Sequence, residues 1–376
     1  MKTSVRENVG GRTCQWWAKV SSIFCLAGNM LLWAAPAQTA TREAMLRDLA
    51  RQVIASGYED LDASCQGLTN AAGQLAETPN QVALARARQA WTAVAMAANH
   101  VRCFQTGPLV DREYAATFYY VRISPPAING LIQQTNAIDR GQVPQLDGNA
   151  KGLFALEYLL FGHKGYPGID KPDGPLVLEM LSGKGSEHRR AYLLVLAQDL
   201  EAKAAQLAQD WSSSGDEGAA AKFVKAGQAS VNLLVNQLAH SIEDAQQNHL
   251  NFVLVLPQPL GRQLYRVEGS ASGTSLQGAI AYLEGMQRFY RGAGGLGLAD
   301  TLKQVNAPLA KRVEDAFVDA ISATKTIGEP LEQAVLDKRD AIQNACNKVH
   351  ALEILFKVDL ASALGVTISF TSGDGD

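Results

Sequence analysis

One carboxylate stands alone in an apolar run, Lys151–Gly162, whose sequence is KGLFALEYLLFG. If this run is a helix, the side chains three and four positions from Glu157 are all apolar: Leu153, Phe154, Leu160 and Phe161. Burying a carboxylate without a partner is costly, so we expect another part of the fold to supply one. An arginine, a metal ion or a bound substrate could each fill that role.

Two His-x-x-Glu pairs also have the spacing of metal ligands, because residues one helical turn apart share a face. His240 and Glu243 lie in LAHSIEDAQQNH, where glutamines indicate a solvated face. His350 and Glu353 lie in VHALEILFK, and Lys357 follows Glu353 by four residues, which predicts an ordinary helix ion pair. Either pair could ligate a metal, and a surface role is the competing interpretation.

Motifs for hydrolysis are weak in this chain. The segment GSASG at residues 269–273 has the glycine spacing of a nucleophile elbow, but Ala271 stands at the nucleophile position. The sequence has no His-Glu-x-x-His helix. The glycines of GAGGLG at residues 292–297 follow no predicted strand, so a helix–helix loop explains them better than a dinucleotide site.

Length and composition indicate a globular protein. The chain has 376 residues, with 47% apolar residues, 19% charged residues and a net charge of -3. These values are typical of folded rather than disordered proteins. No Lys/Arg-rich run or basic-aromatic pattern appears, so nothing predicts a nucleic-acid partner.

The first residues read as a secretory signal peptide. A basic leader is followed by an apolar stretch over residues 20–34 and by an Ala-x-Ala site at Ala35–Ala37. We therefore expect residues 1–37 to be cleaved and the protein to be periplasmic or otherwise exported. A membrane anchor is the alternative, although the apolar stretch is short for a span. No later segment is apolar enough to cross a bilayer.

Export places the remaining cysteines in an oxidising compartment, which permits one disulfide. Cys65, Cys103 and Cys346 remain after cleavage. A Cys65–Cys103 bridge within one half and three buried free thiols are both compatible with the sequence.

Helical periodicity dominates the mature chain and predicts an all-α fold of two four-helix-bundle-like domains, residues 38–175 and 176–376. The expected helices cover residues 42–75, 79–104, 113–136, 149–161, 186–211, 217–249, 273–291, 297–323 and 328–363. A Gly/Pro-rich stretch at 162–175 predicts a loop. Only NFVLVL at 251–256 and VTISF at 366–370 resemble strands, so a parallel sheet is not expected.

A short internal sequence repeat suggests a duplication. LFALEYLLF at residues 153–161 resembles VHALEILFK at residues 349–357, with Ala-Leu-Glu in common. Each copy closes a helical half of comparable length, which makes two related bundles plausible.

Together these motifs resemble the imelysin-like proteins of bacterial cell envelopes, also called the iron-regulated protein A family. The likeness spans nearly the whole mature chain. It rests on four segments: AWTAVAMAANHVRCFQTGP (Ala90–Pro108), GLFALEYLLFG (Gly152–Gly162), YRVEGSASGTSL (Tyr265–Leu276) and DLASALGVTISFTSGDGD (Asp359–Asp376).

The resemblance implies an exported, two-domain helical protein associated with iron acquisition, with a site between the domains. It also implies a Gly-x-His-x-x-Glu signature, for which the family has been classed among metallopeptidases. This chain keeps Gly152 and Glu157 but has Phe154 at the histidine position. Phenylalanine can neither bind a metal nor transfer a proton, which weakens the peptidase interpretation.

The resemblance and the residues together define the candidate site as Glu157, Arg122, Arg266, Glu268 and Ser272. An arginine fork from Arg122 or Arg266 is the favoured partner for Glu157. The more specific alternative is an iron or other divalent metal ion held by Glu157 and Glu268. We therefore expect a non-enzymatic binding or accessory protein that works with iron-uptake proteins of the envelope. A metallopeptidase and an interaction scaffold without its metal site are the alternatives.

Overall fold

The computed structural model describes residues 41–134, 136–162, 174–213, 215–258 and 260–369. Within these ranges the chain is helical and contains no strand, which confirms the all-α prediction. None of the described helices combines the length and the apolar composition needed to cross a membrane. The predicted signal peptide and most of the predicted loop at 162–175 lie outside the described residues.

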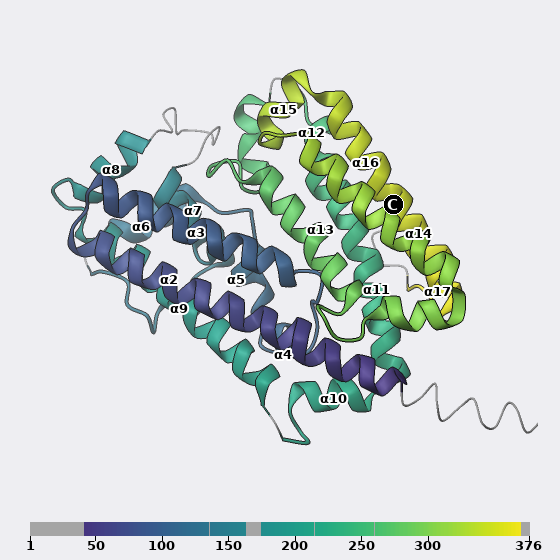
Figure 1. Ribbon diagram of the computed structural model, residues 1–376. Coiled ribbons are helices and arrows are strands. Elements are labelled where there is room, and N and C mark those ends of the chain that lie inside the picture. The colour runs from purple at the N-terminus through teal and green to yellow at the C-terminus, as the bar shows by residue number, and fades with distance from the viewer. Residues whose placement is uncertain (1–40, 135, 163–173, 214, 259, 370–376) are drawn as a thin grey trace, which may run out of the picture.

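The first part of the chain forms a group of helices around α2, here called the N-terminal helical group (Figure 1). Its long members α2, α3 and α9 lie side by side, and α9 packs on α2 although it follows residue 175. The bounds are η1 Leu49–Ala55, α2 Ser56–Glu77, α3 Gln81–Val101, α4 Pro108–Asp111, α5 Ala115–Tyr119, α6 Pro125–Ile132, η2 Val143–Gln145, η3 Gly148–Ala150, α7 Leu153–Phe161, α8 Gly174–Ser182 and α9 Glu187–Ser212.

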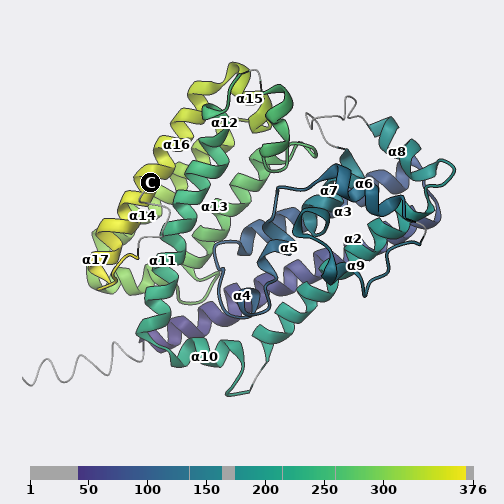
Figure 2. The same cartoon turned by 180° about the vertical axis from the view of Figure 1, so that it is seen from behind.

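The rest of the chain, except for α10 at its start, which packs on α9 and η1 of the first group, forms the C-terminal helical group. The long helices of this second group run across those of the first group (Figures 1 and 2). In this group α13, α14, α16 and α11 pack on one another. The bounds are α10 Ala219–Lys225, α11 Gln228–Asp244, η4 Ala245–Leu250, α12 Phe252–Val255, η5 Gly261–Arg266, α13 Ser275–Arg291, α14 Leu298–Thr326, α15 Leu331–Asp337, α16 Arg339–Ile354, η6 Leu355–Leu360 and α17 Ala361–Ala363.

Local sequence explains where the helices begin and break. Asn80 caps α3 by accepting a hydrogen bond from the backbone N–H of Ala83 at 2.9 Å. The predicted helix at 217–249 is divided because Gly227 adopts a φ of 56°, which separates α10 from α11. Within α14 the backbone is kinked at Asn306, two residues before Pro308.

Both strand predictions are wrong. The segment at 251–256 contains α12, whose residue Val255 donates a backbone hydrogen bond to Asn251 at 3.2 Å. A lone apolar strand would leave its backbone groups unpaired, whereas a helical turn pairs them locally. The described residues 366–369 form no strand either; Asn236 of α11 holds this extended tail through Ser369 and the carbonyl of Thr367.

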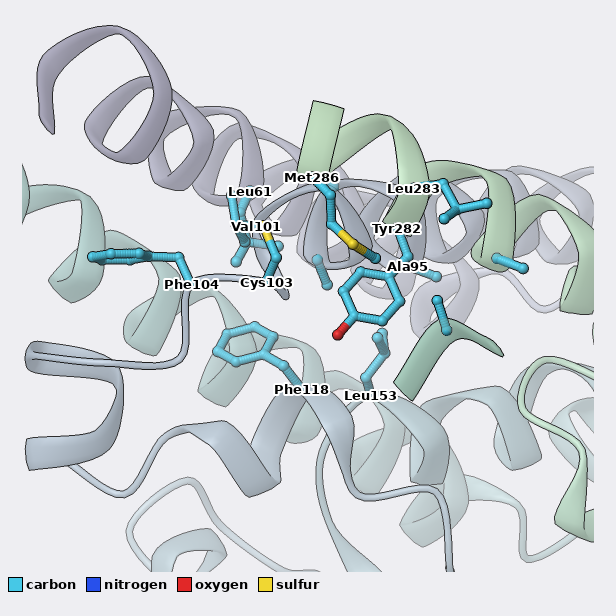
Figure 3. Close-up of a cluster of buried hydrophobic side chains, with 14 of the residues drawn as sticks. Leu61, Ala95, Val101, Cys103, Phe104, Phe118, Leu153, Tyr282, Leu283 and Met286 are labelled. Carbon is cyan, nitrogen blue, oxygen red and sulfur yellow. The ribbon is translucent and has the colours of Figure 1, made fainter. Parts of the chain in front are cut away.

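One continuous apolar core joins the two helical groups where α13 crosses α3. Figure 3 shows side chains from α2, α3, α5, α7 and α13 meeting there, including Tyr282 and Met286 of α13. The three cysteines after the leader, Cys65, Cys103 and Cys346, are buried free thiols, so the Cys65–Cys103 bridge is not formed.

The crossing of α13 over α3 depends on Gly285. A Cβ atom at this position would lie 2.3 Å from the carbonyl oxygen of His100, which is backbone and cannot move aside easily. The absence of a side chain therefore sets how closely the two helices approach.

Replacing Gly285 with alanine should destabilise the protein by about 1–3 kcal/mol, because the new methyl group overpacks the helix crossing. Urea unfolding measures this change. Gly67→Ala in α2 is the control, since a Cβ there meets nothing within 4 Å and should be neutral or stabilising. A Gly285→Ala variant as stable as the parent would contradict the described crossing.

Candidate functional site

Helix α7 carries Glu157 into the junction between the helical groups. Gly152, the residue before the helix, has a φ of 84°, and a Cβ there would lie 2.4 Å from the carbonyl oxygen of Thr117. Trp91 of α3 fixes the first turn by donating its indole N–H to the carbonyl of Leu153 at 2.8 Å. The helix is therefore held on both sides, and Glu157 is only 7% exposed.

Ser272 is the partner of Glu157. One carboxylate oxygen, Oε1, accepts hydrogen bonds from the backbone N–H of Ser272 at 3.0 Å and from its hydroxyl at 2.6 Å. The Ser272 hydroxyl also lies 2.8 Å from the hydroxyl of Thr274 and 3.1 Å from the carbonyl oxygen of Gly269. Glu157 thus ends a short chain of hydrogen-bonding groups that begins in the turn segment 268–274 of the other helical group.

The environment of Glu157 favours its protonated form. Burial raises the pKa of this carboxyl group from 4.5 to about 7, although the two hydrogen bonds from Ser272 act in the opposite direction. The carboxylates of Glu268 and Glu332 contribute smaller increases to this raised pKa. Glu157 can therefore accept or release a proton close to neutral pH.

Glu268 opens the same turn segment and is held by Arg102, the residue that follows α3. The guanidinium nitrogen Nη1 of Arg102 donates to both carboxylate oxygens of Glu268, at 2.9 Å and 2.8 Å. This ion pair is largely buried and joins the two helical groups. Buried pairs are strongly destabilised when one partner is removed, because the remaining charge has no compensation.

Further groups surround Arg102. Its guanidinium lies 5.2 Å from the ring centroids of both Tyr119 and Tyr282, and 3.7 Å from the carboxylate of Asp244. Burial lowers the pKa of Arg102, but Glu268 and Asp244 outweigh it, so the pKa is raised. Burial raises the pKa of Glu268, but the nearby Arg102 outweighs it and the pKa is lowered. Both groups are therefore charged at neutral pH.

Neither predicted arginine contacts Glu157. Arg122 is exposed on the segment between α5 and α6. Arg266 is also exposed; it donates to Gln263 at 3.0 Å and lies over the ring of Phe252. Of the predicted residues, the structure brings Ser272 to Glu157 and places Glu268 in the same segment.

Arg102 is the residue that sequence reasoning missed. It lies within the quoted segment Ala90–Pro108, but its partner Glu268 is 166 positions away in the chain. The available signal was an arginine at a helix end with apolar neighbours on both sides, Val101 before it and Cys103 and Phe104 after it.

The two His-x-x-Glu pairs form a separate cluster in the C-terminal helical group, where Lys357 joins them. The ammonium group of Lys357 lies 2.9 Å from both Glu353 and Glu243, and the pairing with Glu353 confirms the predicted helix ion pair. His350 lies 3.0 Å from Glu353, and His240 lies 3.9 Å from Glu243. A lysine cation thus occupies the position between the two carboxylates.

The described residues do not fit a metal centre. Among them, no group of three His, Cys, Asp or Glu side chains is placed to hold one ion. At Glu157 the histidine position is filled by Phe154, whose ring packs against Trp91. The donors on Glu157 are the hydroxyl and amide of Ser272, and both oxygens of Glu268 are bonded to Arg102.

Comparisons with known proteins agree on one family. The family model Peptidase_M75, described as Imelysin, matches residues 54–356 of this chain. No curated protein matched the chain.

Two solved structures share the fold. A protein of Parabacteroides distasonis ATCC 8503 described as an iron-regulated protein A precursor superposes with a TM-score of 0.71 and 16% identity, covering 86% of this chain and 95% of its own. An imelysin-like protein of Psychrobacter arcticum 273-4 gives a TM-score of 0.70 and 17% identity, covering 88% of this chain and 98% of its own. At these identities the likeness concerns the fold.

The raised pKa of Glu157 predicts a pH-dependent difference between the parent and Glu157→Gln. Because the folded-state pKa of about 7 exceeds 4.5, the folded parent binds the proton more tightly and loses stability as pH rises through this interval. Glutamine resembles the protonated acid and does not titrate, so the variant keeps its stability as pH rises. The stability of Glu157→Gln relative to the parent should therefore increase by about 3 kcal/mol between acidic and mildly alkaline pH.

Urea unfolding at several pH values measures this difference, and Glu59→Gln at an exposed position is the control for removing one negative charge. A stability difference that stays constant with pH would show that Glu157 remains charged in the folded protein.

Proposed function

The chain belongs to the imelysin family, and from that premise we propose that it is an exported, non-enzymatic binding or accessory protein linked to iron uptake. The observation that carries the non-enzymatic part is the pair Phe154 and Glu157. Phe154 supplies no ligand or proton carrier, and Oε1 of Glu157 accepts both of its hydrogen bonds from Ser272. A hydrolytic metal centre needs three protein ligands with an open position for water, and the described residues offer no such set.

The link to iron is supported by the name of a relative in fold, the iron-regulated protein A precursor of Parabacteroides distasonis. Export is supported by the leader, apolar stretch and Ala-x-Ala site of residues 1–37. On this proposal the partners are iron-uptake proteins of the cell envelope, and any metal ion is cargo rather than a catalytic cofactor.

The proposal includes two four-helix-bundle-like domains derived from one ancestral unit. This duplication is supported by the sequence similarity between α7 and the α16–η6 region. Glu157 and Glu353 occupy the same position in the two similar segments, and both are buried. Each of these carboxylates lies where helices from different parts of the chain meet.

A deletion strain grown under iron limitation tests the role in iron uptake. We expect lower cellular iron and slower growth than in the parent strain, with recovery on expression of the intact gene and no defect in iron-rich medium. The protein recovered from the periplasmic fraction should begin near Gln38. Equal iron content in the two strains would contradict the iron link.

A peptidase assay on the purified protein distinguishes the enzymatic alternative. We expect no cleavage of casein or of a mixed peptide library, with or without added divalent metal, because no described ligand set activates water. Chelator-sensitive cleavage that Glu157→Gln abolishes would establish a metallopeptidase. An absence of both cleavage and any iron phenotype would favour a scaffold.

A further inference from the structure

Arg189 of α9 is a buried cation without a carboxylate partner among the described residues. Its side chain is 8% exposed, and it forms none of the ion pairs found in the described part of the chain. One guanidinium nitrogen, Nη2, donates to the side-chain oxygen of Asn129 in α6 at 2.6 Å. Its guanidinium carbon lies 5.9 Å from the ring centroid of Tyr158 in α7.

Its neighbours are neutral hydrogen-bonding groups. The hydroxyl of Tyr158 and the amide of Asn129 contact each other at 3.0 Å and 3.1 Å. Helices α6, α7 and α9 therefore converge on one guanidinium, one amide and one hydroxyl. Buried charges are normally paired because desolvation of an isolated ion is expensive.

Arg102 and Arg189 differ in whether a carboxylate contacts the guanidinium. Arg189 is buried and the Arg102 side chain is largely buried, and both lie beside tyrosine rings, but Arg102 donates to both carboxylate oxygens of Glu268 and has a raised pKa. Burial lowers the pKa of Arg189, and the only opposing group is Tyr158. Among the described residues, no anion compensates the desolvation cost of Arg189.

The position of Arg189 in its helix adds a second, independent argument. It is the third residue of α9, a helix of 26 residues whose preceding residue, Ser186, makes no side-chain cap. A helix N-terminus is electropositive, so a cation in the first turn is unfavourable by itself and an anion is favourable. The guanidinium and the helix end therefore favour the same kind of ligand.

We propose that Arg189, Asn129 and Tyr158 form a binding site for a small carboxylate. A planar guanidinium matches a carboxylate through two parallel hydrogen bonds. A monoanion balances the single buried cation, whereas a phosphate dianion would bring a second charge into a desolvated site. The site is distinct from the Glu157–Ser272 contact and does not depend on the proposed link to iron.

Sodium acetate is the probe, compared with sodium chloride and sodium phosphate at equal ionic strength and pH. The melting temperature of the parent should rise saturably with acetate beyond any effect of chloride, and less with phosphate. Arg189→Met should remove the acetate response, weakening apparent affinity at least about tenfold, the loss expected for a charge-assisted hydrogen bond.

Two variants give the proposal further tests in the absence of added carboxylate. Asn129→Asp supplies a carboxylate to Arg189 from within the chain, so it should raise the melting temperature and abolish the acetate response. Arg189→Met should not lower the melting temperature, because it removes an uncompensated charge. Arg102→Met is the matched control and should lower it, since Glu268 is left unpaired.

An unchanged parent in acetate, an equal acetate response in Arg189→Met, or a lower melting temperature for Asn129→Asp would each overturn the proposal. A phosphate response equal to or larger than that of acetate would overturn the assignment to carboxylates.

Discussion

The ion pair between Arg102 and Glu268 is the constraint on which the junction between the two helical groups depends. Arg102 follows the last turn of α3, and Glu268 begins the turn segment that leads into α13. Both side chains are largely buried, so separating them would leave an uncompensated charge, at a cost of about 3–5 kcal/mol. Because the pair fixes the beginning of the turn, it also fixes where the turn presents Ser272 to Glu157.

The partner of Glu157 comes from outside its helix because its own helix offers none. In the repeated segment of α16 and η6, Glu353 has His350 and Lys357 on its own face, and both contact it. The equivalent positions around Glu157 hold Phe154 and Phe161, which pack instead on Trp91 with ring centroids 6.4 Å and 5.4 Å away. With aromatic residues at both positions, α7 offers Glu157 no polar neighbour, and the carboxylate depends on the turn at 268–274.

Periodicity in the sequence was sufficient to predict the long helices, because the apolar stripe of each helix is a local property. It failed at residues 251–256, where a short apolar run fits a strand and a helical turn equally well. It was also sufficient to predict that Glu157 is buried and paired. The identity of the partner could not be predicted from spacing, since Ser272 lies 115 positions away and Arg102 and Glu268 are 166 positions apart. Arg189 gave no signal in the sequence, because the absence of a carboxylate among its described neighbours depends on how the helices pack in space.

The central claim is that the Arg102–Glu268 pair positions Ser272 for Glu157, and a double-mutant cycle tests it most directly. Arg102→Met removes the guanidinium that bonds both oxygens of Glu268, and Ser272→Ala removes the hydroxyl from Glu157. Unfolding free energies of the parent, the two single variants and the double variant give their coupling. Although Arg102 and Ser272 share no hydrogen bond, we expect a coupling of at least about 1 kcal/mol. Single-variant effects that add to within about 0.5 kcal/mol would show that the two contacts are independent.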